Sequence, residues 1–182
     1  MSKLQQKIEQ AHKQGRIALI PFLTAGFPNL NEFWVQLKQL DDNGADIIEI
    51  GVPFSDPVAD GPVVEMASVR ALELGVSLGW ILAELKKRQG QYKAELVLMG
   101  YYNPFLQYGL KKFAKDAAAC GVSGVIIPDL PLNEDAEIRA ALEAEGLNLI
   151  SLVGPNTSEE RMREYAKVAK GYVYVVSVMG IT

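Results

Sequence analysis

Histidine and cysteine are almost missing from this chain of 182 residues, which has one of each. His12 lies in a polar leading segment, so catalytic triads with a histidine base and histidine-rich zinc sites are excluded by inventory. Cys120 cannot form an internal disulfide, and its place in Ala-Ala-Ala-Cys-Gly favours a small buried side chain over a nucleophile. We therefore expect no metal site, a cytoplasmic location, and chemistry carried by carboxylates, tyrosines and backbone.

A long hydrophobic run is lacking too. The most apolar stretch, 172–181, is far shorter than the ~20 residues that cross a bilayer, and the N-terminus has no apolar core of a secretory signal. Eighteen basic residues against 22 acidic ones give a net charge of -4, without a basic stripe suited to nucleic-acid phosphates. We expect no membrane and no nucleic-acid partner, and a single domain over residues 1–182.

Short apolar runs alternate with longer amphipathic stretches, which is the pattern of parallel βα units. The apolar runs are nearly continuous, as in strands that are buried on both faces. The predicted strands are 17–23, 46–52, 95–100, 124–128, 148–153 and 172–178. The predicted helices are 30–43, 64–74, 77–88 with Ser77 as its cap, 110–119, 133–145 and 158–170.

Glycine punctuates this pattern but does not form a phosphate-binding turn. Gly44, Gly121 and Gly146 follow three of the predicted helices, where a left-handed C-terminal cap favours glycine. An open doubly wound sheet is the rival architecture, and it should carry a G-x-G-x-x-G turn after an early strand. No such turn is present in the sequence, so we favour a parallel barrel.

Glu49 interrupts the apolar strand 46–52. The period of two places Ile48 and Ile50 on one face of this strand, and Ile47 and Glu49 on the other. In a closed barrel Glu49 would point into the interior near the C-terminal mouth, where burial should raise its pKa toward a range useful for proton transfer. A structural glutamate bonded to backbone is the alternative, and we favour a functional role because lone buried carboxylates gather at functional sites.

The loop after this strand has two more carboxylates and three prolines. Asp-Pro and Asp-Gly are common turn dipeptides, so spacing alone leaves Asp60 undecided between a turn residue and a functional one. Four segments then resemble the signatures of the tryptophan synthase alpha subunit in order and spacing: PFLTAGFP at 21–28, EIGVPFSDPVADGP at 49–62, MGYYNP at 99–104 and PDLP at 128–131. The resemblance extends over essentially the whole chain.

The resemblance implies a fold and a reaction. The fold would be a TIM (β/α)8 barrel, of which about six βα units are present in this chain. The reaction would be a carbon–carbon lyase step in tryptophan biosynthesis, the retro-aldol cleavage of indole-3-glycerol phosphate to indole and glyceraldehyde 3-phosphate. Glu49 would be its general acid and base, and Asp60 would stabilise positive charge on the indole ring nitrogen.

The resemblance also implies binding residues and a partner. The substrate-binding residues would be Phe22, Tyr101, Ile126, Leu152, Tyr174 and Thr182. The partner would be the pyridoxal-phosphate-dependent beta subunit in an alpha-beta-beta-alpha complex, and this subunit itself would bind no cofactor. The interface residues would be Pro53, Asp56, Asn103 and Asp129.

Two other functions remain open at this point. A stand-alone indole-3-glycerol-phosphate lyase would use the same chemistry without a beta subunit. A catalytically inactive alpha-like protein would only bind the beta subunit; Glu49 and Asp60 argue against it, whereas the chain's end at Thr182 argues for it. A barrel of eight units takes ~250 residues. We therefore expect that the chain is truncated at its C-terminus and that the 182-residue chain alone is inactive.

Overall fold

A computed structural model describes residues 1–177 of the chain. Its single sheet has six parallel strands in the order β1-β2-β3-β4-β5-β6. The strands are β1 (Phe22–Thr24), β2 (Ile47–Gly51), β3 (Glu95–Met99), β4 (Val122–Ile126), β5 (Asn148–Val153) and β6 (Val173–Val175). Because the spatial order follows the chain order without a reversal, the sheet is a run of barrel strands and not a doubly wound sheet.

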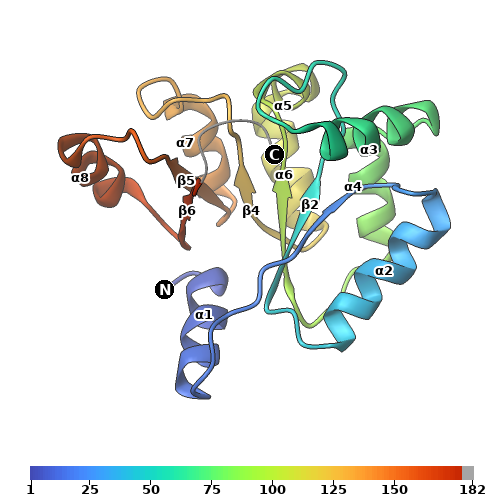
Figure 1. The fold of residues 1–182 in the computed structure, drawn as a ribbon, viewed down its shortest axis with the longest axis horizontal. Helices are drawn as coiled ribbons and strands as arrows, with labels where there is room; N and C mark the ends of the chain where they lie inside the picture. The colour runs from blue at the N-terminus through green and yellow to red at the C-terminus, as the bar shows by residue number, and fades with distance from the viewer. Residues whose placement is uncertain (178–182) are drawn as a thin grey trace.

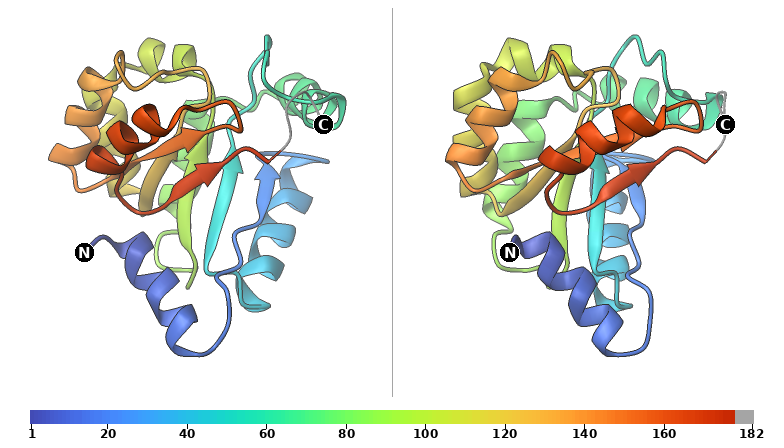
Figure 2. Two further views of the ribbon diagram at one scale, coloured as in Figure 1. Left: turned by 60° about the vertical axis from the view of Figure 1, so that its left-hand side comes forward. Right: turned by 90° about the vertical axis from the view of Figure 1, so that its left-hand side faces the viewer.

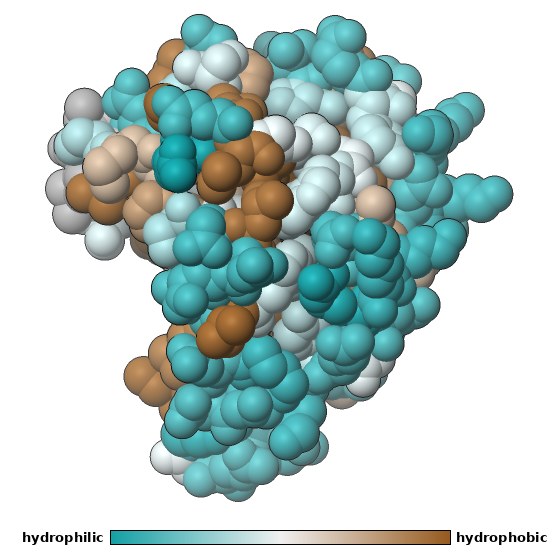
Figure 3. All heavy atoms as spheres, turned by 90° about the vertical axis from the view of Figure 1, so that its right-hand side faces the viewer, coloured by the Kyte–Doolittle hydropathy of each residue, from teal (hydrophilic) through white to brown (hydrophobic). Residues whose placement is uncertain are grey.

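The helices that connect the strands cover the outer side of the curved sheet, and one further helix precedes the first strand (Figure 1). The helices are α1 (Lys3–Lys13), α2 (Leu30–Asp42), α3 (Pro62–Glu73), α4 (Leu78–Lys87), α5 (Tyr102–Tyr108), α6 (Leu110–Ala119), α7 (Ala136–Ala144) and α8 (Glu159–Val168). Figure 2 shows that the sheet curves while β1 and β6 remain at its two open edges. The face seen in Figure 3 is largely hydrophilic, with hydrophobic side chains gathered in a limited region.

The two faces of the sheet bury different sets of side chains, as the alternation predicts. Ile48 and Ile50 belong to the large cluster between the strands and the helices. Ile47 lies in a smaller cluster on the inner face, together with Val97 and Ile150. Leu4 of α1 packs into this inner cluster, so the leading helix closes the end of the sheet where the strands begin (Figure 1).

Most predicted element positions are confirmed, and the left-handed glycines are among them. Gly44, Gly121 and Gly146 have φ values of 92°, 86° and 74°. Ser77 caps α4 by accepting from the amide of Trp80. Among residues 1–177 no single helix is long and apolar enough to cross a membrane, and α3 with α4 passes such a test only as a pair bent by 78°.

Three sequence predictions need correction. The first strand is shorter than 17–23, because only Phe22–Thr24 form a regular ladder with β2, although the carbonyls of Leu19 and Pro21 still accept from β2 amides. The last strand is Val173–Val175 rather than 172–178, whose final residue lies outside the described residues. Helix α5 was not predicted, because its seven residues are too few to show a helical period.

Candidate functional site

A cavity of about 430 Å³ opens at the C-terminal ends of the strands, and we call it the reaction cavity. This is the end of a parallel barrel where the loops after the strands build active sites. The lining residues come from every strand or its following loop: Phe22, Glu49, Ala59, Asp60, Gly61, Val64, Met99, Pro128, Leu152, Tyr174, Val175, Val176 and Ser177. Two carboxylates, Glu49 and Asp60, therefore share one largely apolar space.

Glu49 is fixed on β2 with its side chain on the inner face. The strand pairs Glu49 with Phe22 of β1 and with Val97 of β3, and the residue is only 4% exposed. The hydroxyl of Tyr172 donates a hydrogen bond of 2.7 Å to its Oε1. Burial raises the pKa of Glu49, while the bond from Tyr172 lowers it, and the net direction is upward as the sequence predicted.

Asp60 lies in the loop between β2 and α3, and its side chain is half-buried. Burial raises the pKa of this carboxyl, and the neighbouring hydroxyl of Tyr101 lowers it. The amide of Ala59, one residue earlier, donates to the hydroxyl of Tyr101 over 2.8 Å. Tyr101 therefore ties the loop that carries Asp60 to the end of β3.

Tyr101 lies beside the reaction cavity and does not line it. It lines a small adjoining cavity of about 20 Å³, which shares Phe22 and Asp60 with the reaction cavity. Its ring packs against Phe54, with 5.3 Å between the centroids. Burial, with Asp60 nearby, raises the pKa of Tyr101 to about 12, so this hydroxyl stays protonated.

The other predicted binding residues fall into three groups. Phe22, Leu152 and Tyr174 line the reaction cavity. Ile126 is completely buried in the inner cluster and lines neither the reaction cavity nor the small adjoining one. Thr182 lies outside the described residues.

Tyr172 is a site residue that the sequence reasoning missed. It lies directly before β6 and two positions before Tyr174, so the period of two places both side chains on the inner face of the sheet. The two-residue spacing from Tyr174 could therefore have predicted that Tyr172 faces the interior. Its contact with Glu49 was not readable, because 123 positions separate the two residues.

The four predicted interface residues lie in loops and a short helix at the same end of the sheet. Pro53 is buried, whereas Asp56 and Asn103 are exposed. Asp129 is exposed and accepts a hydrogen bond of 2.9 Å from the amide of Tyr102 at the start of α5. Three of the four are thus open to a partner, and Asp129 also holds α5.

Cys120 is buried at the C-terminal end of α6, where its thiol donates to the carbonyl of Leu82 over 3.1 Å. This agrees with the predicted small filler. Within residues 1–177 no group of three or more His, Cys, Asp or Glu side chains could hold a metal ion.

Six sequential parallel strands with helices outside them, and a cavity at the C-terminal ends of the strands, define this chain as part of a TIM-barrel enzyme. A sequence model of the family described as tryptophan synthase alpha chain matches residues 8–182. The chain belongs to this family.

Known relatives agree with this assignment. The tryptophan synthase alpha chain of Nitratidesulfovibrio vulgaris strain Hildenborough is 65% identical over 181 residues, which are 100% of this chain and 70% of the relative. That of Desulfovibrio desulfuricans is 66% identical over 182 residues, 100% of this chain and 71% of the relative. A solved structure of Mycobacterium tuberculosis tryptophan synthase is similar to this chain with a TM-score of 0.94 and 38% sequence identity. The match covers 100% of this chain and 70% of the chain in that structure.

Proposed function

We propose that Glu49 and Asp60 carry out the reaction of the tryptophan synthase alpha chain family. That reaction is the cleavage of indole-3-glycerol phosphate to indole and glyceraldehyde 3-phosphate in tryptophan biosynthesis. Alpha chains need no cofactor of their own, because the pyridoxal phosphate belongs to the beta subunit with which they form alpha-beta-beta-alpha complexes. The observation that carries the proposal is the pair of carboxylates in one 430 Å³ cavity.

Glu49 has the properties of the acid and base in this cleavage. The bond between indole C3 and the glycerol side chain breaks after C3 takes up a proton, and the side-chain hydroxyl must lose its proton as a carbonyl forms. A carboxyl whose pKa is raised by burial keeps a proton available for C3 and can then accept the hydroxyl proton. One residue can therefore serve both steps.

Asp60 fits the role of the fixed anion. Protonation of C3 places positive charge on the ring nitrogen, and an ionised carboxylate that accepts from the indole N–H stabilises that charge strongly in a cavity that excludes water. The loop that carries Asp60 is held through Ala59 and Tyr101. Such anchoring supports the role, because electrostatic stabilisation needs a group that is already in position.

The apolar walls would hold the indole ring. Phe22, Leu152 and Tyr174 offer ring-sized apolar surface next to Glu49 in the reaction cavity. Tyr101 would act mainly through the Asp60 loop. Ile126 would pack in the inner cluster behind the cavity wall and not touch the substrate. The proposed contact of Thr182 rests on the family resemblance alone.

The beta subunit would dock on the loops around the cavity mouth. Asp56, Asn103 and Asp129 are exposed there and give a polar rim, while Pro53 is buried and would shape the loop instead of touching the partner. The single buried cysteine favours a cytoplasmic location for the reaction. Residues 1–182 would form one barrel domain, because one sheet carries the cavity.

Three variants test the assignment. They are best made both in this chain and in a chimaera that continues into the sequence following the matched region of the Nitratidesulfovibrio relative, each assayed with the beta subunit for indole release. Glu49→Gln should lower kcat by at least ~10²-fold, the low end of general acid–base catalysis. Asp60→Asn should lower kcat less than Asp60→Ala, because the amide still accepts from the indole N–H.

The outcomes separate the alternatives. Activity of Glu49→Gln within a few-fold of the unchanged chimaera would contradict the acid–base role. Equal kcat for both Asp60 variants and the unchanged chimaera would leave Asp60 as a turn residue. Full activity that does not respond to the beta subunit would favour a stand-alone lyase, and binding of the beta subunit without any activity would favour an inactive partner.

A further inference from the structure

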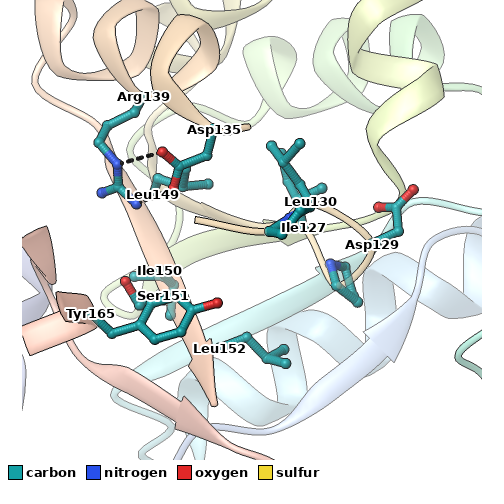
Figure 4. Close-up of a pocket in the computed structure, with 12 residues that line it drawn as sticks. Ile127, Asp129, Leu130, Asp135, Arg139, Leu149, Ile150, Ser151, Leu152 and Tyr165 are labelled. Atoms are coloured by element: carbon teal, nitrogen blue, oxygen red, sulfur yellow. Dashed lines mark hydrogen bonds and ion pairs between the residues drawn. The ribbon is translucent and has the colours of Figure 1, made fainter. Parts of the chain in front are cut away.

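A second cavity, of about 290 Å³, lies behind β5, and we call it the rear pocket (Figure 4). Its walls come from the loop after β4, from helices α7 and α8, and from β5 itself. The residues are Ile127, Pro128, Asp129, Leu130, Pro131, Asp135, Arg139, Leu149, Ile150, Ser151, Leu152 and Tyr165. Pro128 and Leu152 also line the reaction cavity, so only β5 and this loop separate the two spaces.

Ser151 is the unusual residue of the rear pocket. Side chains along β5 point alternately to the two faces of the sheet. Leu149 belongs to the outer cluster and Ile150 to the inner one, so Ser151, two positions after Leu149, points toward the helices. It is only 3% exposed. Its Oγ is the one buried side-chain oxygen or nitrogen that finds no hydrogen-bond partner within residues 1–177. Buried hydroxyls normally have a partner, so this one is an unused donor and acceptor at the wall of the pocket.

The charged groups of the rear pocket are already engaged. The Arg139 guanidinium donates to both carboxylate oxygens of Asp135, from Nε over 3.1 Å and from an amino nitrogen over 2.5 Å, and its other amino nitrogen donates to the carbonyl of Val168 over 3.3 Å. Figure 4 shows this ion pair at one side of the pocket. Neither member needs a charged ligand, and the exposed Asp129 disfavours an anion.

The remaining wall combines apolar side chains with two hydroxyls. Ile127 and Leu149 give aliphatic surface, and Tyr165 of α8 gives an aromatic ring. A group of waters would need two to four polar partners each, and the side chains of this wall offer two hydroxyls, those of Ser151 and Tyr165. The volume is ample for one ring, since an apolar protein cavity of ~150 Å³ binds benzene.

We propose that the rear pocket binds a small neutral aromatic molecule with one hydroxyl or N–H group, which pairs with Ser151. Phenol and indole both belong to this chemical class. The Ser151 hydroxyl both donates and accepts, so either group can be satisfied. The ligand would lie outside the barrel, on the side of β5 opposite the proposed catalytic carboxylates, and the site does not depend on their roles.

Calorimetric titration of the 182-residue chain with phenol, and with toluene as the analogue without a hydroxyl, tests the proposal. The chain should bind phenol saturably and more tightly than toluene. Ser151→Ala should weaken phenol roughly 2- to 10-fold, the value of one neutral hydrogen bond, and leave toluene unchanged. Ser151→Ile should weaken binding of both, because the larger side chain takes up part of the pocket.

A matched control is Ser123→Ala, which removes a buried serine hydroxyl of β4 that already bonds Glu95 and does not line the rear pocket. This variant should bind phenol like the unchanged chain. Thermal melts show whether Ser151→Ile folds; if it does not, the phenol and toluene affinities of Ser151→Ala decide. No saturable phenol binding by the unchanged chain, or phenol affinities of both Ser151 variants equal to that of the unchanged chain, would overturn the proposal.

Discussion

The hydroxyl of Tyr172, the residue directly before β6, donates a hydrogen bond of 2.7 Å to Oε1 of Glu49 in β2. Two opposed effects act on the carboxyl at this contact. Burial raises the pKa of Glu49, and the bond from Tyr172 lowers it, with burial the larger effect. Burial, together with the nearby Glu49, raises the pKa of Tyr172, so the phenol stays protonated and remains a donor. Tyr172 thus limits how far the proposed acid is pushed from its ordinary range.

Replacing Tyr172 by Phe should raise the pKa of Glu49 further, because the bond that favours its ionised form is lost. If Glu49 begins the reaction protonated, the limb of the pH–kcat profile where activity falls on its deprotonation should move to higher pH. Profiles of the chimaera with and without the change would show this. Tyr174→Phe is the control, because Tyr174 lines the same cavity without a hydrogen bond to Glu49. An unmoved limb in Tyr172→Phe would contradict the coupling.

The same buried carboxyl predicts a pH-dependent stability. The folded pKa of Glu49 lies above its ordinary value of 4.5, so the folded protein loses stability when the group ionises. At pH values below 4.5 both folded and unfolded chains hold the proton and the penalty is absent. Above the folded pKa the penalty is complete, at ~1.4 kcal/mol for every pH unit that separates the folded pKa from the unfolded one.

Glu49→Gln removes this penalty and should therefore stabilise the 182-residue chain at pH 8 and not at pH 4. Thermal or urea unfolding at the two pH values measures the difference. Asp56→Asn is the control, since its carboxyl is exposed and lies outside the cavity. A Glu49→Gln variant that is equally or less stable than the unchanged chain at pH 8 would show that burial does not disfavour the ionised form.

The sequence predicted the parts of the fold that depend on periodicity. The two faces of β2 followed from the alternation of Ile48 and Ile50 with Glu49, because a buried strand leaves little freedom of register. Helix α5 was missed. It begins after Tyr101 without a side-chain cap. Pro104 lies in its first turn, where a helix tolerates proline, but in the sequence a proline suggests a turn.

The site residues also differ in how far the sequence alone could predict them. Glu49 was a candidate from the strand pattern alone, since a lone carboxylate among apolar residues is visible in sequence. Asp60 was not, because Asp-Gly in a proline-rich loop is ordinary turn chemistry, and only the family resemblance raised it above that. Neither the Tyr172 contact nor the unpaired Ser151 was predictable, because both depend on distances between segments remote in the chain.

Tyr101 gives a third prediction, about the loop that carries Asp60. Tyr101→Phe removes the acceptor for the Ala59 amide and leaves the ring in place against Phe54. The loop should loosen, and kcat of the chimaera should fall roughly 2- to 10-fold, corresponding to one net hydrogen bond. Tyr108→Phe is the matched control, because it loses a comparable hydroxyl bond of 2.8 Å to Asp116 outside the site. Equal kcat values for the two variants would argue against an anchoring role.

The two edges of the sheet support the last prediction, which concerns the 182-residue chain in solution. β1 and β6 each have one neighbour, and their outer edges pair with nothing among residues 1–177 (Figure 2). Apolar side chains are exposed at both: Ile17 at 84%, Leu19 at 54%, Val173 at 41% and Val175 at 66%. Open strand edges flanked by exposed apolar residues pair with other chains, so we expect the isolated chain to self-associate at micromolar concentrations.

Val173→Lys places a charge beside the β6 edge and should shift the chain toward monomer, because a lysine on an edge strand opposes pairing with a second copy. Sedimentation velocity over a concentration series measures the shift. Val35→Lys is the control, since Val35 is also exposed, at 48%, but lies on helix α2 and not on an edge strand. If the unchanged chain sediments as a monomer at all concentrations, the edges are not adhesive. If both lysine variants dissociate it equally, added charge and not edge pairing controls the association.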